Sequence, residues 1–215
     1  TDHNSLAGVV RAYSALKELR REHGDAARLP KLIIGARLVL RDSDIHWLAL
    51  PHDRAAYARL TRLLTLGKRR APKGACHLDL RDIVQGGAGM SLIALPQSDL
   101  HDSAEEIATL RKHFPTDVFI GAAPRYDGSD QQYFDAVARL AHRTAAPMVA
   151  VGDVLMHHGS RRQLADVLTC MREGITIDEI GTRALLNAER RLKGAADMAR
   201  LFARHPAALR RTVEI

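Results

Sequence analysis

The chain has 215 residues, of which 46% are hydrophobic and 27% charged, a balance typical of a folded protein rather than a disordered one. No apolar run approaches the roughly 18 residues of a membrane helix, and the two cysteines lack the spacing of a disulfide framework or a zinc finger. Lysine and arginine outnumber the acids by 32 to 25, and the resulting net charge of +7 is compatible with a nucleic-acid partner. Because the chain begins at Thr1 and its thiols look reduced, we expect a fragment of a cytoplasmic protein.

Hydrophobic periodicity predicts an α/β fold. The first half is expected to hold a helix from an Asn4 or Ser5 cap to residue 23, a hairpin of strands over 31–41 and 45–50, and a helix capped by Asp53 that runs to about residue 66. Strands over 90–95, 118–122 and 148–151 then alternate with helices over 103–114, 129–145 and 160–172. This alternation predicts βαβ units and a parallel sheet, followed by short helical pieces over 175–215.

Polar residues at strand ends are the first candidates for a site, because ligands collect at strand ends in parallel α/β folds. They are Gln97-Ser98-Asp99, Arg125 and Asp153, with His157 shortly beyond. Thr1-Asp2-His3 stands directly before a predicted helix, where another strand would end.

Several sequence blocks, taken together, resemble one family. Thr1-Asp2-His3-Asn4 before a capped helix is similar to the second motif of the PHP (polymerase and histidinol phosphatase) superfamily. The blocks LLTLGKRR at 63–70, KGACHL at 73–78, GDVLMH at 152–157, DVLTCMREG at 166–174 and NAERRLK at 187–193 follow in order. At these spacings they resemble the PHP domain of bacterial C-family DNA polymerase α-like subunits, most of all the error-prone, damage-induced branch.

The resemblance implies an irregular seven-stranded (β/α) barrel over residues 1–175, here without its first strand, and a helical extension over 176–215 that leads to the polymerase body. The parent would be a DNA-directed DNA polymerase, a nucleotidyltransferase of replication, repair and translesion synthesis. Its expected partners are DNA, the rest of its own chain and, through the parent, a sliding clamp and mutagenesis accessory proteins, with no membrane.

Family members hold up to three divalent metals, and the resemblance implies that this centre is degenerate here. Asp2 and His3 match their motif, but Gly35-Ala36-Arg37 stands where Gly-x-Glu is expected, and arginine cannot ligate a cation. Asp153 matches the late Asp-x-His motif, whereas Leu155 replaces its histidine and His157 lies two residues further on.

The opening His-x-His motif would lie upstream of Thr1. With two motif positions matched, two lost and this motif missing, we expect no catalytic residue and no cofactor in this chain. If the centre is retained, Asp2, His3, Asp153 and His157 would hold zinc, manganese or magnesium. We expect Arg37 to take the place of a cation and to pair with Asp2 or Asp153. The competing interpretation gives Asp2 and His3 a helix-capping role and makes Asp153 a turn carboxylate.

A basic segment is the remaining candidate. Arg62, Lys68, Arg69, Arg70 and Lys73 lie in a stretch, residues 54–73, that contains no acid. They are expected to dock on another domain or to contact DNA phosphates. The leading hypothesis is therefore a mainly structural domain of an error-prone polymerase. The alternatives are a metal-dependent phosphoesterase or 3′–5′ exonuclease, and a basic nucleic-acid-binding module.

Overall fold

The computed structural model describes residues 1–24, 29–97 and 100–215, so Ser98 and Asp99 of the predicted strand-end group lie outside the described residues. The chain divides into two compact units. Unit 1 contains residues 1–120 and 140–147, and unit 2 contains residues 121–139 and 148–215. Within the described ranges, none of the helices combines the length and the apolar character needed to cross a bilayer.

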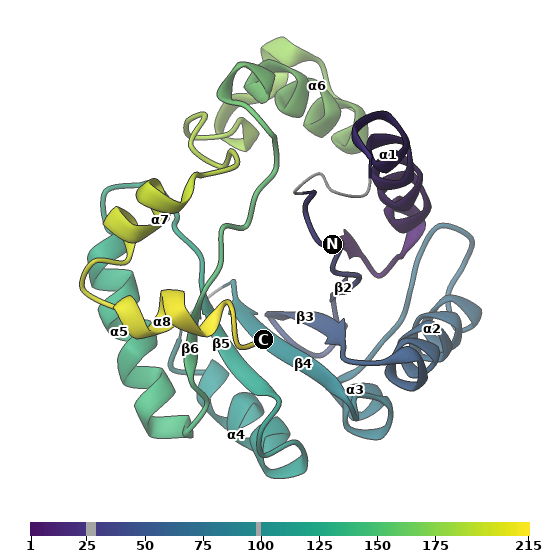
Figure 1. Cartoon of the computed structure of the whole chain (residues 1–215), viewed down its shortest axis with the longest axis vertical. Coiled ribbons are helices and arrows are strands. Elements are labelled where there is room, and N and C mark those ends of the chain that lie inside the picture. The colour runs from purple at the N-terminus through teal and green to yellow at the C-terminus, as the bar shows by residue number, and fades with distance from the viewer. Residues whose placement is uncertain (25–28, 98–99) are drawn as a thin grey trace. The chain divides into compact units, whose positions relative to one another are not determined.

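The elements follow one another as shown in Figure 1. The strands are β1 (Asp2–His3), β2 (Ala36–Leu38), β3 (Ile45–Pro51), β4 (Met90–Pro96), β5 (Val118–Ala122) and β6 (Met148–Ala150). The helices are α1 (Ala7–His23), α2 (Arg54–Arg69), α3 (Leu80–Gly86), α4 (Ser103–His113), α5 (Asp130–Thr144), α6 (Arg162–Glu173), α7 (Ala195–Leu201) and α8 (Pro206–Arg211). Short 3₁₀ turns lie at Gly159–Arg161, Ile177–Glu179 and Gly181–Arg183.

The strands form one mixed sheet in the order β1-β2-β3-β4-β5-β6. β1 and β2 are parallel, β3 is antiparallel to both β2 and β4, and β4 and β5 are parallel. The predicted hairpin and the parallel β4–α4–β5 unit are therefore confirmed, and the sheet is mixed because the short link between β2 and β3 reverses the chain. The described strands form an open sheet, and the seven-stranded barrel stays a prediction.

Within unit 1 the central strands are buried on both faces of the sheet, and exposure increases toward β1. The register aligns Leu38, Trp47, Ala94 and Ile120 on one face, and all four are fully buried. The opposite face carries the neighbouring row, in which His3 is exposed and Arg37 is half-buried. His3 and Arg37 therefore lie at the β1 end of a row whose inner positions, Leu48 and Ile93, are buried.

In α2, the first helix after the hairpin, the predicted cap and the predicted inward-facing residues are confirmed. The Asp53 carboxylate accepts a hydrogen bond from the Ala56 N–H at 2.7 Å, and the predicted apolar positions are buried. α2 runs to Arg69, three residues beyond its predicted end at about residue 66. The helix α3 was not predicted; Asp79 and Asp82 form a capping box at its start.

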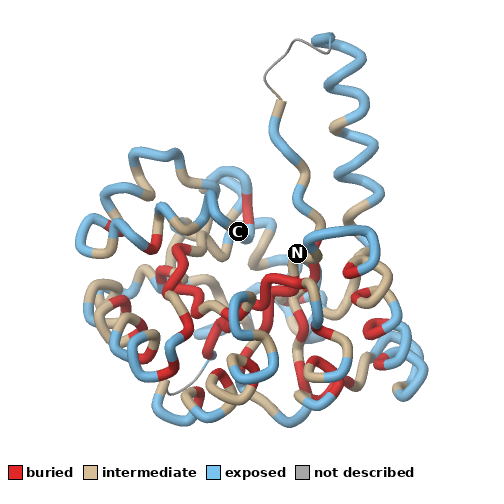
Figure 2. Tube along the Cα trace, turned by 60° about the horizontal axis from the view of Figure 1, so that its bottom comes forward, coloured by how far each residue is buried: buried red, intermediate tan, exposed pale blue. Residues whose placement is uncertain are grey.

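The N-terminal segment departs from two predictions. The side chain of Asn4 does not cap α1; its amide donates to the Val39 carbonyl and accepts from the Val39 N–H, both at 2.9 Å. The predicted strand over 31–41 shortens to β2, and the Asn4 side chain pairs with the backbone of Val39, the residue that directly follows β2. The helix α1 forms as predicted, but none of its residues is buried and its trace is mostly exposed (Figure 2).

Unit 2 is held together by aromatic and ionic contacts between α5 and the C-terminal pieces. The Phe134 and Phe202 rings stack with their centroids 4.5 Å apart. His205 Nε2 lies 2.9 Å from an Asp135 carboxylate oxygen, and the Arg211 guanidinium donates to the Met148 carbonyl. The predicted short helical pieces are confirmed, and they pack against the first part of α5 and against β6.

Candidate functional site

Asp2 and His3 lie on β1, and Asp2 has a capping role. Its carboxylate accepts a hydrogen bond from the Gly8 N–H at 2.7 Å, in the first turn of α1. That N–H is one of the donors that a helix start leaves without an intrahelical partner. For Asp2, the structure therefore supports the helix-capping interpretation.

His3 lies beside a cation. The β1–β2 register pairs His3 directly with Arg37, which places the two side chains on the same face of the sheet. The His46 ring from β3 approaches the His3 ring edge-on, at a centroid separation of 5.6 Å. One guanidinium and two imidazoles thus gather on one face of the sheet in unit 1.

Asp153 lies in unit 2, where an arginine holds it. The Arg190 guanidinium donates both to the Asp153 carboxylate and, at 3.2 Å, to the Asp153 carbonyl. The Leu155 N–H donates to the Arg190 carbonyl at 2.9 Å, so the backbone at Arg190 lies beside the segment that contains Asp153 and Leu155. Leu155 is 51% exposed and His157 is exposed in the bend that follows.

Asp2 and His3 lie in unit 1, whereas Asp153 and His157 lie in unit 2, so neither unit by itself contains all four predicted metal ligands. Within either unit, the described residues contain no group of three or more histidine, cysteine, aspartate or glutamate side chains close enough to share an ion. Asp2 accepts a hydrogen bond from a helix N–H and Asp153 accepts one from a guanidinium, so both carboxylates already have a partner within the fold.

The five predicted basic residues separate into three environments. Arg62 and Arg69 line an open pocket of about 610 Å³ on the outer side of α2, together with Thr61, Thr65, Leu66 and Arg70. Lys68 and Lys73 line a different pocket of about 440 Å³, which His3 also borders. The Arg70 guanidinium donates to Asp82 at 2.7 Å, so its charge stabilises the loop between α2 and α3.

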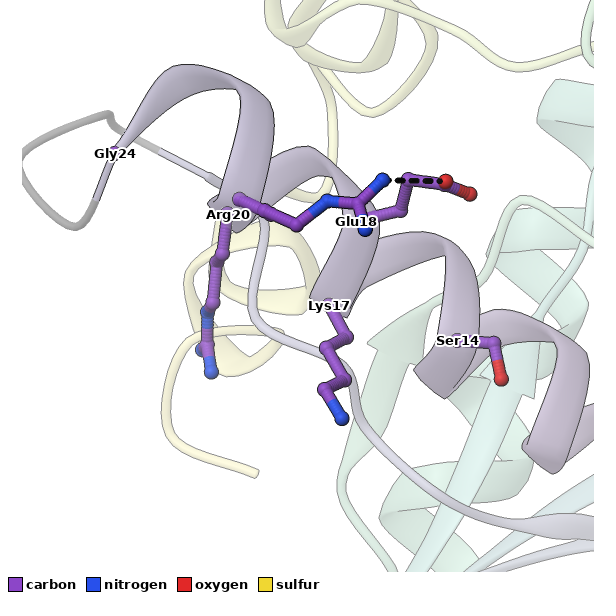
Figure 3. A pocket seen from close by; sticks show the side chains of 6 residues that line it. Ser14, Lys17, Glu18, Arg20 and Gly24 are labelled. Carbon is purple, nitrogen blue, oxygen red and sulfur yellow. Dashed lines mark hydrogen bonds and ion pairs between the residues drawn. The ribbon is translucent and has the colours of Figure 1, made fainter.

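A third pocket, of about 540 Å³, lies along the end of α1 and is lined by Ser14, Lys17, Glu18, Arg20, Arg21 and Gly24. Figure 3 shows the Lys17 and Arg20 side chains extending in the same direction. The Arg21 guanidinium pairs with Glu18 at 3.4 Å. Because a single helix supplies all these side chains, this is a solvated helix surface rather than an enclosed site.

Two ionisable groups near the α2–α3 loop are perturbed by their surroundings. The guanidinium of Arg41 donates to the Asp79 carboxylate, and this lowers the pKa of Asp79. Burial raises the pKa of the Cys76 thiol, and the neighbouring Lys68 charge opposes that rise.

Comparison with known proteins identifies what the chain is related to. The chain is 63% identical to a protein named error-prone DNA polymerase from Ruegeria pomeroyi, over all of its own length and 22% of that protein. It is 47% identical to the protein of the same name from Rhodopseudomonas palustris and 41% identical to that from Caulobacter vibrioides, over 99% and 100% of this chain. The chain is homologous to a segment of error-prone DNA polymerases. No family model matches it.

The resemblance to error-prone DNA polymerases is thus confirmed, and the chain spans about a fifth of the length of these relatives. Two residues of the site region escaped the sequence analysis. The alternation in IHWLALP could have found His46, since it points away from the buried Ile45 and Trp47. No local signal could have found Arg190, which lies 37 residues from its partner Asp153.

Proposed function

We propose that the chain is a PHP-type domain of an error-prone DNA polymerase, with a degenerate metal centre and a mainly structural role. Residues 1–175 would correspond to the (β/α) barrel, and residues 176–215 would lead to the polymerase body. The homology to error-prone polymerases over the whole chain supports the assignment of the parent. DNA and the remainder of a longer polymerase chain would then be its partners.

The observation that carries the degenerate centre is the pairing of Arg37 with His3 in neighbouring strands. A guanidinium stays charged at every physiological pH and has no lone pair to offer, so beside His3 it opposes a divalent cation. The other motif carboxylates already serve the fold, Asp2 at the start of α1 and Asp153 with Arg190. Remnant ligands of this kind favour structural support over phosphoester hydrolysis.

Metal content tests this proposal. The chain would be incubated with zinc and manganese, desalted and analysed for metal atoms per chain by mass spectrometry. We expect a value close to zero. One or more tightly held atoms, together with release of phosphate from p-nitrophenyl phosphate, would instead establish the metal-dependent phosphoesterase.

A restored variant makes the test sharper. Arg37→Glu combined with Leu155→His returns the two missing residue types of the family pattern, and we expect it to retain metal after desalting. The matched control is Arg62→Glu with Leu164→His, which makes the same chemical changes at exposed positions on α2 and α6. If the restored variant binds no more metal than this control, the assignment to a PHP metal centre is wrong.

A further inference from the structure

One pocket of unit 1 brings together residues that lie far apart in the sequence. His3 and Ser5 form one wall, and Lys68, Lys73 and Cys76 form the other, around a volume of about 440 Å³. The first wall belongs to the segment between β1 and α1, and the second to the end of α2 and the following loop. A pocket of this volume is large enough for a phosphate group and an attached sugar.

The pocket concentrates positive charge without a compensating acid. Among the residues that the structure describes, no carboxylate forms an ion pair with Lys68 or Lys73. Arg70, between them in the sequence, is neutralised by Asp82 outside the pocket. The Ser5 hydroxyl accepts from the Ala7 N–H at 3.1 Å, so its own proton is available to donate to a ligand.

Both walls are fixed before any ligand arrives. The loop folds back on α2 through a hydrogen bond from the His77 N–H to the Gly67 carbonyl at 2.9 Å. Gly67 makes this approach possible, since a Cβ there would lie 2.6 Å from the Cys76 sulfur. Asn4 ties the opposite wall to the backbone of Val39. A preformed pocket loses little conformational entropy on binding, which favours affinity.

We propose that this pocket binds a phosphate group, with the ammonium groups of Lys68 and Lys73 as the main contacts and Ser5 as a hydrogen-bond donor. Lysine binds phosphate as a compact point charge, and the donors of the pocket match the acceptor oxygens of phosphate. The phosphate can belong to a nucleic-acid backbone, a strand end or a small molecule. The proposal goes beyond the function proposed above, because it requires neither a metal nor the polymerase body.

Cys76 offers a direct test, because its half-buried thiol lines the pocket while Cys170 is buried elsewhere and serves as an internal reference. The rate of Cys76 alkylation by iodoacetamide would be measured in inorganic phosphate and in chloride at equal ionic strength. A bound ligand slows alkylation by a factor of 1 + [L]/Kd, so we expect saturable protection of Cys76 alone. Equal rates in phosphate and chloride overturn the proposal.

Two matched variants distinguish phosphate binding in the pocket from a general electrostatic effect of the basic segment. Lys68→Gln with Lys73→Gln removes both pocket cations, and we expect the apparent affinity for phosphate to fall by roughly tenfold or more. Arg62→Gln with Arg69→Gln removes the same charge from the outer side of α2, and we expect a change of less than about twofold. Because Lys68 also tunes Cys76, the ratio of rates with and without phosphate is compared rather than the rates themselves. Equal losses in both variants overturn the proposal.

Oligonucleotides identify the source of the phosphate. Short oligothymidylates with a 5′-hydroxyl or a 5′-phosphate would replace inorganic phosphate as the probe. Equal protection by both assigns the pocket to the nucleic-acid backbone, and protection by the 5′-phosphate form alone assigns it to strand ends. Protection by inorganic phosphate and by neither oligonucleotide assigns it to a small phosphorylated molecule. The metal measurement above is independent, so either proposal can fail without the other.

Discussion

Replacing Arg70 with alanine removes the guanidinium that lies 2.7 Å from the Asp82 carboxylate. The Asp82 side chain is only 1% exposed, whereas that of Arg70 is 35% exposed. Loss of one partner costs about 3–5 kcal/mol for a fully buried pair and about 0–1 kcal/mol for an exposed one. Because water can enter from the side that Arg70 vacates, we expect an intermediate loss of about 2 kcal/mol in the free energy of unfolding.

Urea denaturation followed by circular dichroism measures this loss, and a thermal melt should show a decrease in Tm of roughly 4–8 °C. Arg69→Ala is the matched control, since Arg69 is exposed and neighbours Arg70; we expect a change within about 0.5 kcal/mol. A double-mutant cycle with Asp82→Asn should give a coupling energy of about 1–2 kcal/mol. Equal free energies of unfolding for Arg70→Ala and Arg69→Ala would refute a structural role for Arg70. Arg70 would then again be a candidate for contact with DNA.

Two further predictions concern unit 1. Gly67→Ala places a Cβ 2.6 Å from the Cys76 sulfur and should destabilise the chain by about 1–3 kcal/mol in thermal or urea unfolding. Gly86→Ala, whose Cβ meets nothing closer than 3.6 Å, should be neutral or slightly stabilising, and equal losses would contradict the argument. The Glu106 carboxylate accepts a hydrogen bond from the Trp47 indole N–H at 2.8 Å, and burial raises the pKa of Glu106. The folded protein therefore holds the Glu106 proton more tightly than the unfolded chain does, so the free energy of unfolding falls as pH rises through the raised pKa. Glu106→Gln should therefore gain stability relative to the parent as pH increases from acidic to neutral; a difference that is constant with pH would contradict this.

The elements with strong local signals were predictable from the sequence. β5 has the predicted bounds, and α2 has the predicted cap and buried positions, because helix capping and 3.6-residue periodicity act within one or two turns. The seven-residue helix α3 escaped prediction, since its start depends on a capping box between Asp79 and Asp82 that reads equally well as a polar loop.

The candidate site was predictable only in part. The sequence shows Arg37 where the resemblance implies a glutamate and Leu155 where it implies a histidine, and these departures motivate the proposed degenerate metal centre. The position of Arg37 beside His3 required the parallel register of β1 and β2, which joins residues 34 positions apart. Strand pairing over such a separation depends on the packing of the whole sheet and carries no local signature.

Short-range patterns determined the α/β class and the helix and strand order of most of the chain. The relation to error-prone polymerases came from sequence blocks that resemble that family, and comparison with known proteins confirmed it. Only the tertiary structure decided how the basic segment divides its charges. The Arg70 guanidinium donates to the buried Asp82, 12 residues further along the chain. Lys68 and Lys73 instead line a pocket that His3, near the start of the chain, also borders. The direction of each side chain depends on where α2 ends and how the following loop folds back across Gly67, and both are set by packing between distant segments.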